Sequence, residues 1–302
     1  MISIIVCSVD DKMFGSFEQN ITHTIGVEHE IIRINNSNNS FSICGAYNEG
    51  ARRAKYEFLC FVHEDVIMQT PRWGKILCEI FRENRELGLL GVAGTMYKSY
   101  APWGWSLIPG ESVINIIQGH KYSNSPAYQV YKNPANKTLS EVVCIDGVLM
   151  FTRKSIVEEI QFDEETLHGF HGYDIDFSLS VFRKYKVAVT FDILMTHLSE
   201  GKNDHAWVSE TLKLHKKWKR ELPATIHLKS SDKWAGYEIS AVNDLLVHMR
   251  KLNFTPWELL DMLNYNNRNR HINKFYLLRL KLSVVKQWIK TVFGGRKLAS
   301  QS

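Results

Sequence analysis

The chain has 302 residues, of which 44% are hydrophobic and 23% are charged, and its formal net charge is +5. This length is enough for one large α/β domain with an appendage, or for two domains with a sizeable core. No segment reaches the roughly 18 apolar residues that a membrane-spanning helix needs. The sequence also contains no internal repeats or low-complexity segments, which excludes repeat and disordered architectures.

The N-terminus and the cysteines predict a cytoplasmic protein. Residues 1–7 read as a first strand and lack the positively charged region of an export signal. The five cysteines show no CxxC spacing, and three of them lie in apolar, strand-like runs. We interpret them as reduced core residues.

Charge is distributed unevenly along the chain. No acidic residue follows Asp261, so the body before it is mildly acidic and the tail is strongly basic. The tail carries nine cationic residues: Arg268, Arg270, Lys274, Arg279, Lys281, Lys286, Lys290, Arg296 and Lys297. Such a tail is suited to a phosphate-rich or acidic partner: a membrane, a nucleic acid or an acidic protein.

Runs typical of strands alternate with runs typical of helices up to about residue 200. The strand-like runs cover residues 2–9, 30–34, 56–62, 88–93, 142–152 and 187–191. Helical runs cover 14–23, 43–54, 73–84, a short stretch from 155–159 and the later part of 167–183. Alternation of this kind predicts an α/β fold with a mostly parallel sheet flanked by helices. Residues 97–140 break the pattern with several Gly, Pro, Trp and Tyr residues, and we expect a long loop or lid there.

The chain becomes helical after Lys202. Residues 255–258, Thr-Pro-Trp-Glu, form a capping box with Pro at the first helical position. In the last helix, predicted over residues 271–293, apolar residues recur at spacings of three and four among Lys and Arg: Phe275, Leu278, Leu282, Val285, Ile289 and Val292. This pattern fits binding to an anionic membrane surface, docking on the rest of the chain, or a homodimer seam. We therefore expect an α/β domain over residues 1–220 and a helical, basic C-terminal extension over residues 221–302.

The most informative motif follows the strand predicted at 56–62. His63, Glu64 and Asp65 end this strand abruptly. Open α/β sheets bind ligands at the carboxyl ends of their strands. Carboxylates placed there can hold a hard cation and, through it, a diphosphate.

Four segments, in order, carry a resemblance to a known family. They are residues 5–10 (IVCSVD), residues 48–50 (NEG) leading to 63–66 (HEDV), residues 145–150 (IDGVLM), and residues 170–177 (FHGYDIDF) with the later His197. Together they resemble a glycosyltransferase of the GT-A fold in the broad family-2-like group, in the branch that carries His-x-Asp in place of Asp-x-Asp. The resemblance covers residues 2–201.

The resemblance implies a role for each matched residue. A divalent metal, Mn²⁺ or Mg²⁺, would be held by Asp65, His63 and His197, and imidazole suits Mn²⁺ better than Mg²⁺. Asp174 would be the general base. The nucleotide would be bound by Ser8, Val9, Asp10, Asn35, Asn48 and Glu64. The acceptor or donor sugar would lie near Asp146, Gly147, His171, Tyr173, Trp103 and Trp105.

The residue types alone leave structural alternatives open. Asp174 also fits a helix cap, and Asp176 fits a first-turn charge. His197 also fits an ordinary structural histidine, and Asp146-Gly147 also fits a turn or bulge. The two tryptophans fit stacking on a sugar and packing of a large loop equally well.

The leading hypothesis is transfer of a sugar from a nucleotide-diphosphate donor to a hydroxyl of a saccharide or lipid-linked saccharide, with inversion, in bacterial surface polysaccharide synthesis. A cytoplasmic protein that associates peripherally with the membrane would fit the basic tail, and a homodimer stays open. A degenerate nucleotide-binding scaffold is the non-enzymatic alternative. A sugar-phosphate nucleotidyltransferase is disfavoured because no Gly-rich, Lys-bearing phosphate loop follows the first strand. Nucleic acid is not an expected partner, because no recognised binding module is present.

Overall fold

The computed structural model describes residues 1–106, 110–121, 125–227 and 233–294. The chain forms two compact units. Unit 1 comprises residues 1–98, 104–214 and 224–227, and unit 2 comprises residues 99–103, 215–223 and 228–302. Among the described helices, none combines the length and the apolar content that crossing a bilayer requires.

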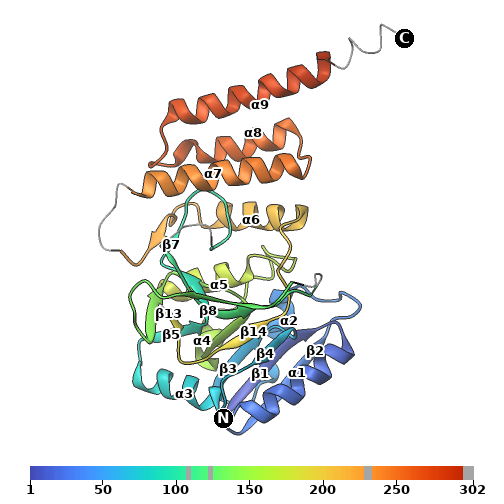
Figure 1. Ribbon diagram of the computed structural model, residues 1–302, viewed down its shortest axis with the longest axis vertical. Coiled ribbons are helices and arrows are strands. Elements are labelled where there is room, and N and C mark those ends of the chain that lie inside the picture. The colour runs from blue at the N-terminus through green and yellow to red at the C-terminus, as the bar shows by residue number, and fades with distance from the viewer. Residues whose placement is uncertain (107–109, 122–124, 228–232, 295–302) are drawn as a thin grey trace. The chain divides into compact units, whose positions relative to one another are not determined.

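Unit 1 is built on a seven-stranded sheet (Figure 1). Its spatial order is β10 (Leu139–Val142), β13 (Lys186–Thr190), β5 (Leu87–Gly91), β12 (Leu149–Arg153), β3 (Phe58–Val62), β1 (Ile2–Ser8) and β2 (His29–Asn35). Strand β1 runs parallel to β2 and β3, and β13 runs parallel to β5. Strand β12 lies antiparallel between β3 and β5, and β10 is antiparallel to β13. The carboxyl ends of β1, β2 and β3 therefore meet at one edge of the sheet.

Helices cover both faces of this sheet. Helices α1 (Asp11–Thr24) and α3 (Trp73–Glu83) contribute to one core cluster. Helices α2 (Ile43–Arg53), α4 (Lys154–Glu159) and α5 (Tyr173–Phe182) contribute to the other. Successive strand residues point to opposite faces, so Ile4 of β1 belongs to the first cluster and Ile5 to the second. The predicted α/β fold with a sheet flanked by helices is confirmed.

A smaller sheet corrects the prediction of a long loop over residues 97–140. Its order is β11 (Cys144–Ile145), β6 (Ala93–Thr95), β8 (Ser112–Gln118), β14 (Met195–His197) and β4 (Val66–Met68), with β9 (Tyr128–Lys132) paired to β8. Strand β7 (Tyr97–Lys98) pairs with β15 (Ala224–Thr225). Much of the segment is thus sheet. Asn115 interrupts the apolar run of β8, so the sequence pattern did not reveal this strand. The Asn115 side chain can be buried because its amide donates hydrogen bonds to the carbonyls of Phe191 and Ile193.

The run at 142–152, predicted as a single strand, contains the last residue of β10, all of β11 and most of β12. The chain turns at residues 146–148, between β11 and β12, and the Asp146 carboxylate accepts a hydrogen bond from the Val148 amide at 2.8 Å. Helix α5 begins one residue before Asp174, and its N-cap is Gly172 with φ of 78°. Asp174 therefore lies in the first turn of the helix and is not its cap.

Unit 2 is helical. Helix α6 (His205–Lys217) begins in unit 1 and ends in unit 2. Unit 2 then contains α7 (Lys233–Lys251), α8 (Pro256–Tyr265), a 3₁₀ turn (Asn266–Arg268) and α9 (Lys274–Gly294). Thr255 and Glu258 form the predicted capping box at the start of α8. The Glu238 carboxylate of α7 is fully buried and accepts hydrogen bonds from the amides of Tyr100 and Ala101, which fixes residues 99–103 to this unit.

Candidate active site

A pocket of about 370 Å³ opens in unit 1 where β1 and β3 end. Ligands of open α/β sheets bind at this position, because side chains that follow neighbouring parallel strands converge there. The pocket is lined by Cys7, Val9, Met13, Asn39, Ile43, Tyr47, His63, Glu64, Asp65, Lys121, Phe170 and Tyr173.

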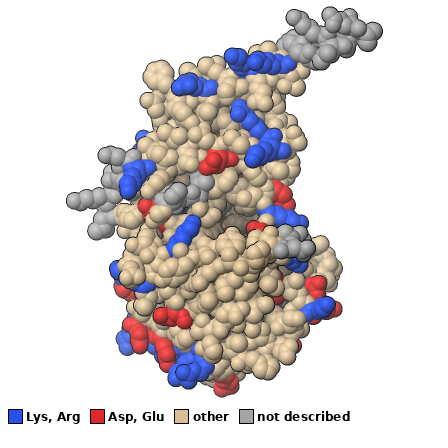
Figure 2. All heavy atoms as spheres, in the orientation of Figure 1, with Lys and Arg blue, Asp and Glu red and all other residues tan. Residues whose placement is uncertain are grey.

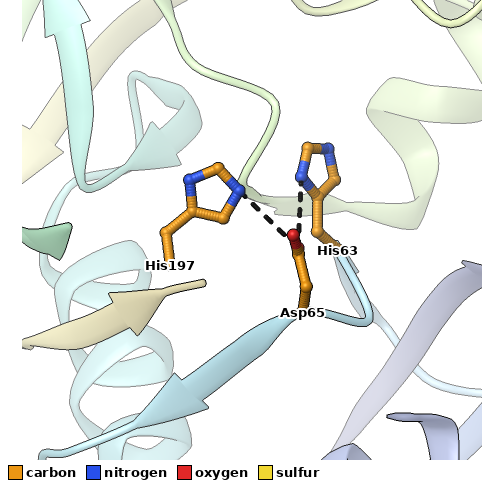
Figure 3. Close-up of side chains that lie close together, drawn as sticks. All are labelled: His63, Asp65 and His197. Atoms are coloured by element: carbon orange, nitrogen blue, oxygen red, sulfur yellow. Dashed lines mark ion pairs between the residues drawn. The ribbon is translucent and has the colours of Figure 1, made fainter. Parts of the chain in front are cut away.

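Two histidines and one aspartate lie close together (Figure 3), and two of them, His63 and Asp65, line the pocket. Asp65 Oδ1 lies 3.6 Å from His197 Nε2 and 3.9 Å from His63 Nδ1. One potential ligand atom from each side chain lies within 4.8 Å of the others. The strand pairing explains why His197 arrives here, because β14 is antiparallel to β4 with His197 opposite Val66, next to Asp65. The three predicted metal-binding residues are thus adjacent in the structure.

The protonation states in this cluster suit a cation. Burial lowers the pKa of His63, and the neighbouring His197 lowers it further, so His63 is held neutral. Burial alone would raise the pKa of Asp65, but the two imidazoles and the Ser199 hydroxyl outweigh burial and hold this pKa below its ordinary value. A neutral imidazole and an ionised carboxylate are the forms that coordinate metals.

Tyr173 connects this cluster to the rest of the site. Its hydroxyl lies 2.7 Å from His63 Nε2, on the ring edge opposite the nitrogen that faces Asp65. A Cβ atom at Gly147 would lie only 2.0 Å from the Tyr173 hydroxyl oxygen. Gly147 is therefore required for the buried phenol to reach His63.

A pair of carboxylates lies beyond Tyr173. Asp174 accepts hydrogen bonds from the amide of Gly147 at 3.1 Å and from its neighbour Ile175 at 2.9 Å. Asp146 accepts a hydrogen bond from the indole N–H of Trp105 at 2.9 Å. The turn at Asp146 and Gly147 thus supplies one carboxylate of the pair, Asp146, and its Gly147 amide donates a hydrogen bond to the other, Asp174.

Asp174 has the protonation behaviour of a group that can take up a proton near neutral pH. Burial, followed by the negative charge of Asp146, raises the pKa of Asp174 to about 7, although the amides of Ile175 and Gly147 oppose this shift. A general base works best when its pKa lies near the operating pH.

Val9 and Glu64 form the other wall of the pocket. The Val9 amide donates to Glu64 Oε1 at 3.1 Å, and the second oxygen, Glu64 Oε2, is buried without a hydrogen-bond partner. Asp10 is the N-cap of α1 and accepts from the Met13 amide, which lowers its pKa. Asp10 lies next to the pocket lining, not within it.

Three residues predicted to bind the nucleotide have other partners. The Ser8 hydroxyl is buried and accepts from Arg33 Nε at 3.0 Å. Asn35 is exposed, and its side-chain oxygen accepts from the Ser37 amide. Asn48 is buried in α2, where it exchanges two hydrogen bonds with the backbone of Phe162, and it lines a separate cavity. The structure does not bring these side chains into the pocket beside Asp65.

Of the other two predicted residues, one belongs to unit 1 and the other to unit 2. His171 is half-buried just before the start of α5, and burial lowers its pKa. Trp103 belongs to unit 2, where its ring lies edge-on to His248.

The sequence analysis missed several residues of the pocket. Lys121 brings a cationic side chain to its lining, and Phe170, which is 43% exposed, brings an aromatic ring. Phe170 is the first residue of the segment 170–177, which already carried part of the family resemblance. Lys121 lies in the segment expected to be a loop, where no spacing marks it.

Comparison with known protein families decides the family. The profile described as "Glycosyltransferase like family" matches residues 3–225. The chain belongs to this glycosyltransferase-like family. Membership confirms the prediction that the protein is a glycosyltransferase. The observed α/β architecture agrees with the predicted GT-A fold. The match includes His63, Asp65, Asp174 and His197, and it ends before helices α7, α8 and α9.

Solved structures are similar to the chain at low sequence identity. The crystal structure of GalNAc-T7 with UDP, GalNAc and Mn²⁺ is similar over 99% of this chain and 58% of that one, with 10% identity and a TM-score of 0.48. The chain thus spans less than two thirds of that protein. Residues 1–349 of TarS from S. aureus are similar over 96% of this chain and 91% of that one, with 12% identity and a TM-score of 0.44. A comparison with curated protein sequences gave no match.

Proposed function

We propose that this glycosyltransferase transfers a sugar from a nucleoside diphosphate donor to a hydroxyl of a saccharide or lipid-linked saccharide, with inversion and with the help of a divalent metal. The observation that carries the proposal is the convergence of His63, Asp65 and His197, because the first two of these line the pocket at the carboxyl ends of β1 and β3. Family membership supports the reaction class.

The three side chains fit a transition-metal ion. Two imidazole nitrogens and one carboxylate oxygen favour Mn²⁺ over Mg²⁺, which prefers oxygen ligands. The bond from His63 Nε2 to Tyr173 leaves His63 Nδ1 directed at Asp65, and outer partners of this kind fix a ligand's tautomer and orientation. When bound, the metal would neutralise the charge of the departing diphosphate.

Other residues of the pocket are suited to the nucleotide. Lys121 contributes positive charge for the diphosphate, and Phe170 contributes an exposed ring on which a base can stack. The unpartnered oxygen of Glu64 can accept a hydrogen bond from a ribose hydroxyl or a base N–H. Val9 would fix this carboxylate through its amide.

Asp174 is the proposed general base. It would take the proton of the acceptor hydroxyl as the oxygen attacks the anomeric carbon, while the bond from that carbon to the diphosphate oxygen breaks. One base on the acceptor side is sufficient for a single displacement, which inverts the anomeric configuration. Asp146, held by Trp105, keeps the pKa of Asp174 raised. Bacterial surface polysaccharide synthesis, in which acceptors are carried on lipids, is the setting that we propose.

A thermal-shift panel tests the donor class directly. Uridine, guanosine, cytidine and thymidine diphosphate sugars would be added with and without Mn²⁺, because a ligand that binds only the native state must raise its stability. We expect one nucleotide class to raise the Tm, and to do so only with Mn²⁺. If no nucleotide sugar changes the Tm under either condition, the proposal is wrong.

A further inference from the structure

Helix α9 of unit 2 has an apolar face that the unit does not cover. Its inward side is packed: Leu277 and Val284 are 1% and 2% exposed, and the Tyr276 hydroxyl donates to Asn243 of α7 at 2.7 Å. Its outward side carries what we call the α9 ridge, with exposed fractions of 78% for Phe275, 51% for Leu278, 58% for Leu282 and 45% for Ile289.

The ridge is continuous and is extended by tryptophans. Its residues follow one another at spacings of three, four and seven, so they form one stripe along the helix. Trp288 of α9 lies against Trp257 of α8, with ring centroids 6.1 Å apart, and these side chains are 41% and 69% exposed. Tryptophan is enriched where proteins meet the headgroup region of a bilayer. An exposed apolar surface that continues across two helices usually marks an interaction site.

The charges beside the ridge have one sign. Arg279 and Lys286 lie one turn after Phe275 and Leu282, beside the stripe, and Lys274 borders it on the other side. No acidic residue follows Asp261. Figure 2 shows Lys and Arg side chains over the part of the surface where Figure 1 draws α9.

The same charges argue against a second copy of this chain as the occupant. If the ridge formed the seam of a coiled coil, the flanking positions would be Lys274, Arg279, Lys281, Lys286 and Trp288. Four of these five are cationic, so two copies would place like charges opposite each other, which is destabilising. A complementary surface must therefore be anionic as well as apolar.

We propose that α9 docks unit 2 on an anionic lipid bilayer, with the α9 ridge buried at the headgroup boundary and the flanking Lys and Arg side chains against lipid phosphates. An amphipathic helix with a basic polar face and Trp, Phe and Leu on its apolar face has the composition of helices that lie in the membrane interface. The attraction of juxtamembrane cations to anionic lipids adds to the burial of the ridge. This inference is independent of the transfer reaction.

Vesicle flotation of the full-length protein tests the proposal. Vesicles of phosphatidylcholine alone would be compared with vesicles that contain phosphatidylglycerol, at low and high salt. We expect flotation with the anionic vesicles, and loss of flotation in high salt because salt screens the charges. Equal flotation with both vesicle types, or flotation with neither, would overturn the proposal.

Matched variants distinguish binding through the α9 ridge from nonspecific binding of other exposed residues to vesicles. Leu278→Ser combined with Leu282→Ser should weaken vesicle binding about tenfold or more, because two large apolar side chains no longer leave water. Val247→Ser, at an apolar residue of α7 that is 47% exposed, should bind like wild type. Arg279→Glu should also weaken binding, whereas Lys137→Glu on an exposed turn of unit 1 should not.

Circular dichroism and light scattering complete the test. Each variant should keep the helical signal and the Tm of the wild type, since all five substituted positions are exposed. If the Leu278/Leu282 variant floats as well as the wild type, the ridge is not the lipid contact. If light scattering instead shows a wild-type dimer that this variant dissociates, and no flotation occurs, the ridge pairs two copies and the proposal is overturned.

Discussion

The two ends of the candidate site, the cluster around Asp65 and the carboxylate pair of Asp174 and Asp146, treat negative charge in opposite ways. At one end, two imidazoles and the Ser199 hydroxyl hold the pKa of Asp65 below its ordinary value, so its carboxylate stays ionised. At the other end, burial and a second carboxylate raise the pKa of Asp174 to about 7. One aspartate thus stays ionised, as the proposed metal ligand must, and the other can take up a proton near neutral pH, as the proposed base must. Environment, not residue identity, separates the two roles.

Tyr173 is the structural link between these ends. Its hydroxyl contacts His63, and the next residue of the chain is Asp174, so both lie in the first turn of α5. The Gly147 amide donates to Asp174, and the missing side chain of Gly147 leaves room for the Tyr173 phenol. A change at this link should therefore disturb both ends, whereas a change at either end should affect only one.

The largest expected effect is on turnover in Asp174→Asn. An amide cannot accept the acceptor proton, and loss of a general base lowers kcat by about 10²–10⁴-fold. Initial rates of sugar transfer measure this loss, with Mn²⁺-dependent donor binding as the control that should stay close to wild type. If the variant keeps more than about a tenth of the wild-type kcat, the base is another residue.

The pH dependence of kcat should follow the protonation of Asp174. The carboxyl is protonated below its pKa and cannot act as a base, so kcat should rise with pH through about 7 and level off above it. Asp146→Asn removes the neighbouring charge that raises this pKa, so the rise should move to lower pH. A rise at the same pH in Asp146→Asn would show that the titrating group is not Asp174.

Gly147→Ala should have a smaller effect on catalysis and a measurable one on stability. The added methyl group meets the Tyr173 hydroxyl, and such overpacking costs about 1–3 kcal/mol in the free energy of unfolding. Denaturant unfolding measures this cost, and Mn²⁺ affinity should fall as well because Tyr173 no longer orients His63.

Gly15→Ala is the matched control for that substitution. An added Cβ at Gly15, in helix α1, meets nothing within 4 Å, so this variant should be as stable as the wild type or more stable by up to about 1 kcal/mol. Equal effects of the two substitutions would contradict the role given to Gly147.

The sequence predicted the parts of the site that follow directly from strand ends. His63, Glu64 and Asp65 come straight after a buried strand, so their position at the sheet edge follows from the alternation of strands and helices. The register that brings His197 beside Asp65 depends on β4 and β14, strands of only three residues each, whose pairing no local pattern reveals.

Residues whose partners are distant in the chain were harder to place. Asn48 stands in a motif, yet its amide satisfies the backbone of Phe162 far along the chain. Strand β8 was hidden because Asn115 interrupts its apolar run, and only the fold supplies the carbonyls that make its burial possible. The ridge on α9 was visible as a periodic stripe, but the sequence did not show that Leu277 and Val284 provide the packed side instead.

Calorimetric titration of a nucleoside diphosphate in the presence of Mn²⁺ tests the separation of the two ends most directly. It would compare the wild type with Asp65→Asn, Asp174→Asn and, as a control at an exposed carboxylate, Asp192→Asn. We expect Asp65→Asn to weaken binding by about 10–100-fold, as loss of a metal site's supporting groups does, and the other two variants to bind like wild type. Undiminished binding by Asp65→Asn, or equal loss in Asp65→Asn and Asp174→Asn, would contradict the proposed assignment of metal binding to Asp65 and of proton transfer to Asp174.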